Sequence, residues 1–206
     1  LHGFPTFAVS IAVQHKDRLE HAVIYDPCRQ ELFTASRGAG AQADGRRIRV
    51  SQQRSIDGAL IGTGFPYRIQ EEHVDTYLKV LKAVMAVAAG VRRPGAAALD
   101  LAYVAAGYTE GFFETGLSPW DVAAGSLLVT EAGGLVGNFS GDSDFLEQKE
   151  CMAANPRIYG QLVGILGKYS KFASAGEKAA VREAAAALTL PQADAAGGPT
   201  DPAGPA

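Results

Sequence analysis

Residues 114–134 read E-T-G-L-S-P-W-D-V-A-A-G-S-L-L-V-T-E-A-G-G, and this stretch decides the fold. Ser118 and Pro119 predict the start of a helix, because a Ser side chain can cap free N–H groups and Pro tolerates the first helical position. The Gly-Gly pair that closes the stretch predicts the end of the helix. Asp121 is therefore a carboxylate in the first turn of a helix made otherwise of apolar and small residues.

Three explanations of Asp121 follow from the stretch alone. An acid in the first turn of a helix interacts favourably with the helix dipole and needs no further function. Asp121 could also pair back to Ser118 as an S-x-x-D variant of the capping box. The third explanation is a functional carboxylate at the mouth of a packed helix, and it depends on which residues the rest of the chain brings near it.

The composition sets the broad class. The chain has 206 residues, 47% of them apolar and 20% charged, which is typical of one globular domain with a sizeable core. A net charge of −3 argues against direct binding of nucleic acid or of anionic membranes, since both require a basic surface. No apolar run is long enough to span a membrane. Cys28 and Cys151 are too few for a disulfide framework, which favours a reduced, cytoplasmic setting.

The first 50 residues predict an antiparallel meander. Short β-rich runs at 7–13, 19–25, 31–36 and 46–50 are separated by Gly, Pro and Asp residues. The run at 7–13 is almost continuously apolar, which is typical of a strand buried on both faces. The chain begins at Leu1 and enters this run almost at once, so we expect that it starts inside a domain.

The remainder of the chain alternates between strands and helices. Strands are predicted at 60–64, 108–114, 135–139 and 151–154, and helices at 71–89, 96–106 and 156–168. Helix 71–89 presents one predicted core face, made of Val74, Tyr77, Leu78, Leu81, Val84, Met85 and Ala88.

The composition changes near residue 170. Residues 1–169 are predicted to form one domain, and Ala, Gly and Pro dominate the tail from 170 to 206. Within that tail, 177–188 could form an Ala-rich helix, and 192–206 is expected to be disordered.

Two further groups of residues suggest a ligand site. Gly95, Ala96 and Ala97 open a helix, where small residues let backbone N–H groups approach an anion, although a simple turn would need the same glycine. Glu114 ends a predicted strand and Asp121 begins the next helix, and such ends commonly share the ligand-binding edge of an α/β sheet. Two carboxylates at that edge suggest a metal or polyol site. The adjacent Arg92-Arg93 pair could receive phosphate, but a solvated or subunit-interface role is favoured.

These residues belong to longer stretches that resemble the inositol monophosphatase family. The family's second signature matches W-D-V-A-A-G and E-A-G-G within 120–134. H-G-F-P-T-F-A-V-S-I-A at 2–12, the Y-D-P meander at 25–41, T-G-F-P at 63–66 and A-L-D-L-A-Y-V-A-A-G at 98–107 match as well. The resemblance runs in order over about residues 1–168, and it implies a layered α/β/α/β/α sandwich of the inositol monophosphatase and fructose-1,6-bisphosphatase type.

The resemblance also implies a function and site residues. Members hydrolyse small phosphate monoesters with Mg²⁺, so a phosphorylated polyol is the expected substrate and a homodimer the expected assembly of the longer parent protein. Asp121 resembles the aspartate that ligates a catalytic metal, and Glu114 the glutamate that binds substrate hydroxyls. Gly95, Ala96 and Ala97 resemble the segment that meets phosphate and sugar oxygens, with Ala96 standing where a Ser or Thr is usual.

One departure qualifies these expectations. The family's first signature, D-P-[IL]-D-G-T, precedes the H-G-F-P stretch, and neither it nor the upstream metal-binding glutamate is present in this sequence. We therefore expect a phosphatase domain missing its N-terminal part, inactive or nearly so as 206 residues. Two alternatives stay open: a non-catalytic protein-binding scaffold, and a related phosphatase acting on another sugar or nucleotide phosphate.

Overall fold

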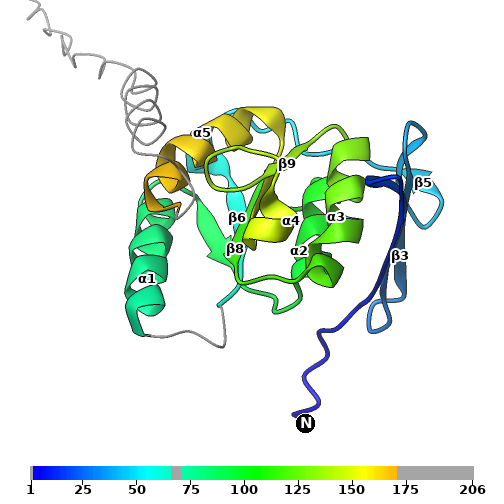
Figure 1. Cartoon of the computed structure of the whole chain (residues 1–206), viewed down its shortest axis with the longest axis horizontal. Coiled ribbons are helices and arrows are strands. Elements are labelled where there is room, and N and C mark those ends of the chain that lie inside the picture. Colours follow the sequence, from blue (N-terminus) through cyan, green and yellow to red (C-terminus); the bar gives the residue numbers. More distant parts are fainter. Residues whose placement is uncertain (1, 66–70, 171–206) are drawn as a thin grey trace, which may run out of the picture.

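The computed structural model of the chain describes residues 2–65 and 71–170, and within them two sheets alternate with two layers of helices (Figure 1). The first sheet is an antiparallel meander in the order β1-β2-β3-β4-β5. Its strands are β1 (Val9–His15), β2 (Arg18–Asp26), β3 (Glu31–Ser36), β4 (Gly40–Ala43) and β5 (Arg46–Arg47).

The second sheet has the order β7-β6-β8-β10-β9. Strand β6 runs parallel to both β7 and β8, whereas β10 runs antiparallel to β8 and β9. Its strands are β6 (Leu60–Thr63), β7 (Gly90–Arg92), β8 (Gly111–Thr115), β9 (Leu135–Gly137) and β10 (Glu150–Ala154). The helices are α1 (Glu71–Met85), α2 (Ala97–Ala106), α3 (Pro119–Glu131), α4 (Phe145–Gln148) and α5 (Pro156–Leu166), with short 3₁₀ turns at Ile56–Gly58 and Gly167–Tyr169.

Helices α2 and α3 lie between the two sheets, and α1 and α5 cover the far face of the second sheet (Figure 1). Strand β8 contributes side chains to the cores on both sides of the second sheet, because successive side chains of a strand point to opposite faces. Phe112 belongs to the core cluster that includes Phe33 of the first sheet and Leu128 of α3, whereas Phe113 belongs to the cluster that includes Val84 of α1. The layered α/β fold expected from the sequence is confirmed. None of the helices in the described residues is both long and apolar enough to span a membrane.

Small residues in the opening stretch let α3 approach α2 closely. A Cβ atom added at Gly125 would lie 2.5 Å from the Leu101 Cβ, so a larger residue would push the two helices apart. Helix α3 is buried along most of its length, as expected for a helix that has a sheet on either side.

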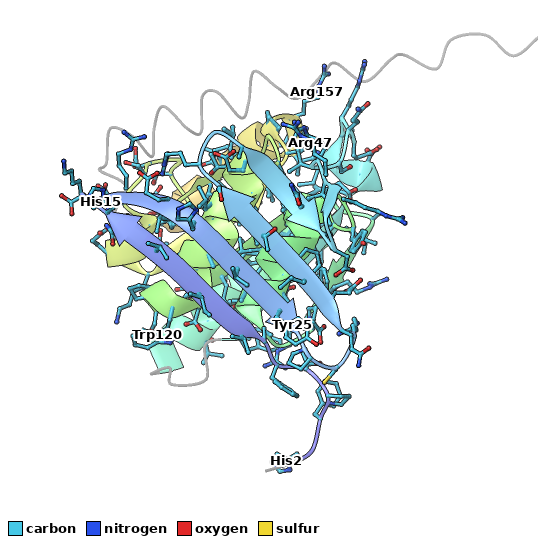
Figure 2. The ribbon with its side chains drawn as sticks, turned by 90° about the vertical axis from the view of Figure 1, so that its right-hand side faces the viewer. His2, His15, Tyr25, Arg47, Trp120 and Arg157 are labelled. Carbon is cyan, nitrogen blue, oxygen red and sulfur yellow. The ribbon has the colours of Figure 1, made fainter. Side chains whose placement is uncertain are left out.

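The structure corrects the expectation for the first strand. We predicted a strand buried on both faces at 7–13, but Val9, Ile11 and Val13 are 47, 53 and 48% exposed. Alternate residues of β1 face the helices, as shown by Ser10 Oγ, which donates a hydrogen bond to the Trp120 carbonyl at 3.0 Å. The opposite face of the sheet is turned toward the viewer in Figure 2, and no described element covers it.

Several element boundaries also differ. Helix α1 ends at Met85 rather than near residue 89, and Val74, Leu78 and Met85 are exposed rather than part of its core face. From residue 74 onward, where the side chains of α1 are described, its buried face is narrower and consists of Tyr77, Val80 and Val84. Strands β4 and β7 and helix α4 were not predicted, and β5 is shorter than expected. The proposed tail elements at 177–188 and 192–206 lie outside the described residues.

Candidate functional site

One cleft, of about 500 Å³, lies where β6 and β8 end and where α2 and α3 begin. Every residue that the sequence analysis named as a site residue lines it: Gly95, Ala96, Ala97, Glu114 and Asp121. The prediction that a strand end and two helix starts share one edge of the sheet is therefore supported. The individual role of each residue stays a prediction.

The N-terminus of α2 forms one wall of the cleft. Gly95 has a φ of +102°, a left-handed conformation that favours glycine, and it turns the chain into the helix. Ala96 is the N-cap in an extended conformation and offers no side-chain cap. Among the described residues, no acceptor takes the backbone N–H of Ala97 or Ala98. These N–H groups and the helix dipole suit an anion such as phosphate.

The opposite wall carries Asp121 in the first turn of α3. Its Oδ2 accepts the Ser118 backbone N–H at 2.8 Å, which is the carboxylate half of the capping box considered from the sequence. No described residue donates a hydrogen bond to Oδ1. The structural and functional explanations of Asp121 are therefore compatible, because one oxygen caps the helix while the other remains available at the cleft.

Glu114 reaches the cleft from the end of β8. A Cβ atom at Gly64 would overlap the Glu114 carboxylate, so the glycine at this position provides the space that the side chain occupies. Burial raises the pKa of Glu114 to about 7, the negative charge of Asp121 adds to the increase, and Arg93 opposes it. Near neutral pH this carboxyl can therefore both donate and accept hydrogen bonds.

The sequence analysis missed a third carboxyl in the cleft, Asp100 of α2. Its side chain is 3% exposed, and no described residue forms a hydrogen bond with it. Burial, assisted by the charge of Glu114, raises the pKa of Asp100 to about 8 against the opposing effect of Arg93. Asp100 thus keeps its proton while Glu114 ionises. A single acid in an otherwise apolar helix was the signal that could have identified it.

Two basic residues also line the cleft. The Arg93 guanidinium lies 5.0 Å from the centre of the Phe65 ring, and Phe65 in turn packs edge-on against Tyr77. Lys149 lines the cleft at the end of α4 and has a left-handed backbone. A solvated or interface role was favoured for Arg93 from the sequence; Arg93 is exposed, and it also lines the cleft.

The cleft residues fit only part of a metal site. Mg²⁺ prefers carboxylate and water oxygens, and the Asp121 Oδ1 atom is one suitable ligand. Within residues 2–65 and 71–170, however, no group of three or more His, Cys, Asp or Glu side chains is arranged to hold a metal ion. Further ligands would be needed to complete a catalytic metal shell.

Comparisons with known proteins agree with the fold and with the order of the motifs. The sequence profile of the inositol monophosphatase family matches residues 1–171. Among curated proteins, the Nus factor SuhB of Pseudomonas aeruginosa is 56% identical over 164 residues, which cover 79% of this chain and 60% of the relative. The Nus factor SuhB of Escherichia coli K12 is 53% identical over 154 residues, covering 75% of this chain and 57% of the relative. The chain thus spans about 60% of the length of these relatives.

Solved structures give the same result. The chain resembles the extragenic suppressor protein suhB of Bartonella henselae with a TM-score of 0.77 and 48% identity, over 81% of this chain and 64% of that one. It resembles the inositol monophosphatase of Anabaena with a TM-score of 0.76 and 35% identity, over 83% of this chain and 68% of that one.

Proposed function

This chain belongs to the inositol monophosphatase family, and on that premise we propose that its cleft serves the Mg²⁺-dependent hydrolysis of a small phosphorylated polyol such as inositol monophosphate. The observation that carries the proposal is the meeting of three elements at one cleft. The anion-binding start of α2, the Glu114 carboxyl and the Asp121 carboxylate all line it.

Each group has a distinct task in this proposal. The N–H groups of Ala97 and Ala98 receive the phosphate oxygens. Glu114 binds hydroxyl groups of the polyol, and its raised pKa lets it act as donor or acceptor. Asp121 offers Oδ1 to the metal and is kept in place by the bond between Oδ2 and the Ser118 N–H.

The metal supplies the step that these side chains cannot perform. Held by Asp121 together with further ligands, Mg²⁺ would supply the activation of a water molecule and the stabilisation of the leaving oxygen. Asp121 alone is a weak site for such an ion, because Mg²⁺ holds its waters strongly and several ligands share the binding energy. We therefore propose that the activity belongs to a protein of the relatives' full length, and that the 206 residues alone turn over little or no substrate.

Phosphate release from inositol 1-phosphate in the presence of Mg²⁺ tests the proposal. The longest reading frame that encodes these residues should be active, and Asp121→Asn within it should lose activity by a factor of 100 or more, about 3 kcal/mol in the barrier. Asp57→Asn, which removes an exposed first-turn acid outside the cleft, is the matched control. Full activity of Asp121→Asn would contradict the assignment, and clear turnover by the isolated 206 residues would contradict the need for further ligands.

A second candidate rests on the names of the relatives. Several proteins similar to this chain are called Nus factors, which implies association with the transcription machinery. In this alternative the fold is a scaffold and the cleft chemistry is dispensable. Complementation of a strain that lacks its SuhB relative separates the two: a catalytic role requires Asp121, whereas a scaffold role tolerates Asp121→Asn. A homodimer and a cytoplasmic location remain predictions of the family resemblance.

A further inference from the structure

Three carboxyl side chains line the cleft, and the proposed function uses only Glu114 and Asp121. The third, Asp100, is the feature that remains unexplained. It lies in α2, a helix whose other residues from Ala97 to Ala106 are all apolar. Burying a carboxyl group without a hydrogen-bond partner costs free energy, so its presence in a packed helix calls for a compensating role.

The geometry directs Asp100 into the cleft rather than into the core. Its Oδ1 lies over Gly62 of β6, where a Cβ atom would come within 2.8 Å of it. Just past the end of the same strand, Gly64 leaves room for the Glu114 carboxylate in the same way. The end of β6 and the residue that follows it thus carry two glycines, Gly62 and Gly64, and each leaves space for a carboxyl group at the cleft.

We propose that Asp100 binds a hydroxyl group of the substrate as a second carboxyl beside Glu114 on the floor of the cleft, and so favours polyols over alcohols with a single hydroxyl. The inference rests on the proposed function and adds a specificity-determining residue to it. In the complex, the hydrogen bond that no described residue supplies to Asp100 comes from the polyol.

The charge state of the two carboxyls supports this assignment. The pKa of Asp100 is raised to about 8 and that of Glu114 to about 7, by burial in both cases. At neutral pH Asp100 therefore keeps its proton and donates a hydrogen bond, while Glu114 is partly ionised and accepts one. Such a donor and acceptor side by side suit neighbouring hydroxyl groups of a polyol, each of which can act as donor and acceptor.

Binding experiments on the 206-residue chain test the inference without requiring turnover. Trp120, the single tryptophan, lines the cleft, so its fluorescence can report ligand binding. The two probes are myo-inositol and inorganic phosphate, titrated separately. Asp100→Ala should weaken myo-inositol binding by about three- to tenfold, the equivalent of one hydrogen bond, and leave phosphate binding unchanged. Asp100→Asn, which keeps a donor, should retain most of the affinity.

A second variant addresses the same point without removing the carboxyl. Gly62→Ala displaces the Asp100 carboxyl through the added Cβ, and it should weaken myo-inositol binding as Asp100→Ala does. Asp26→Asn is the control for a buried aspartate outside the cleft, and it should alter stability but not inositol affinity. Infrared difference spectroscopy gives an independent readout: the part of the protonated-carboxyl carbonyl band that Asp100→Asn removes, which is the Asp100 band, should shift on addition of myo-inositol to the wild-type chain.

The outcomes distinguish the inference from the function on which it rests. Phosphate binding together with inositol binding that is unaffected by Asp100→Ala and Gly62→Ala would overturn only the role of Asp100. An equal loss of both ligands in Asp100→Ala, with the same loss in Asp100→Asn, would make Asp100 structural and also overturn the inference. A wild-type chain that binds neither probe would overturn the inference, whereas the proposed function stands or falls separately on phosphate release by the longer protein.

Discussion

The Glu131 carboxylate, at the end of α3, accepts the backbone N–H of Gly40 at 2.8 Å and with its other oxygen the N–H of Gly38, also at 2.8 Å. Gly38 and Gly40 both have positive φ angles; Gly38 lies in the turn between β3 and β4, and Gly40 is the first residue of β4. One side chain of the opening stretch thus ties the helical layer to the first sheet across more than 90 residues of sequence. Gly residues were expected to separate the first strands, and Glu131 fixes the backbone at one such point.

Glu131→Gln is expected to lower the free energy of unfolding by about 1–3 kcal/mol, because an amide has one acceptor oxygen and cannot serve both N–H groups. Urea unfolding followed by circular dichroism measures the change. Glu147→Gln, at an exposed position in α4, is the control and should be neutral within about 0.5 kcal/mol. A neutral Glu131→Gln would show that water replaces the lost bond at no cost.

Gly64→Ala should impair polyol binding more than stability. The added Cβ would overlap the Glu114 carboxylate, and the end of a flexible side chain can move aside at little cost to the fold. We expect a loss of affinity for myo-inositol of about tenfold, the equivalent of one hydrogen bond. The double variant Gly64→Ala/Glu114→Ala should be no weaker than Glu114→Ala alone, since the two changes act on the same group. Additive losses would show that Gly64 acts independently of Glu114.

The stability of the chain should fall as the pH rises from about 4 to about 8. The pKa of Asp100 is 3.8 in a model peptide and about 8 in the folded chain, so the folded state binds this proton more tightly and loses that advantage as the pH increases. Glu114 acts in the same direction up to about pH 7. Asp100→Asn should reduce the difference in unfolding free energy between about pH 5 and about pH 8 by at least about 1 kcal/mol. An unchanged pH profile would show that Asp100 is ionised or solvated.

The ionisation of Asp26 makes the chain more stable as the pH rises, which is opposite to the effect of Asp100 and occurs at lower pH. Burial alone would raise its pKa, but hydrogen bonds from the Arg29 side chain and from the N–H groups of Arg29 and Cys28 outweigh it and lower the pKa. The stability that these bonds supply is present above the ordinary Asp pKa of 3.8 and is lost as the pH falls through the lowered pKa of Asp26, so the pH comparison for Asp100 is best confined to pH values above about 5.

Asn155→Ala should lower the free energy of unfolding by about 2 kcal/mol. Asn155 is the N-cap of α5, its Oδ1 accepts the N–H groups of Arg157 and Ile158 at 3.0 Å, and its Nδ2 donates to the Gln53 carbonyl at 3.1 Å. Loss of the cap and of a buried partner for the carbonyl both contribute. Asn155→Asp retains the acceptor but not the donor, and it should cost less than alanine. Thermal unfolding of the wild-type chain, Asn155→Asp and Asn155→Ala gives the order of their stabilities.

The sequence predicts the elements that are long or clearly capped. Ser118-Pro119 and Asn155-Pro156 mark the observed starts of α3 and α5, because their capping chemistry is local. Short strands such as β7 form only through pairing with β6, which no local pattern reveals. The end of α1 was misplaced for the same reason, since an alanine-rich continuation looks helical until Gly90 pairs with Leu60.

At the site, too, some residues could be predicted from the sequence and others could not. The motif residues of the cleft could be assigned because they lie next to strand ends and helix starts, and the geometry of those junctions is regular. Asp100 escaped notice because it lies inside a helix, where its importance depends on what faces it. The Asp100 carboxyl occupies space that Gly62 leaves free because glycine has no side chain. A pattern of apolar and polar residues does not reveal where such space is required.

The uncovered face of the first sheet affects how long this polypeptide persists in a cell, independently of the chemistry of the cleft. Figure 2 shows that face open from Tyr25 to His15, and the exposed valines and isoleucine of β1 lie along its edge. An apolar, unpaired edge strand is what chaperones and proteases of a cell recognise, and what neighbouring copies pair with at high concentration. The half-life of these 206 residues, expressed alone, is therefore expected to be set by quality control and aggregation rather than by the strength of its core.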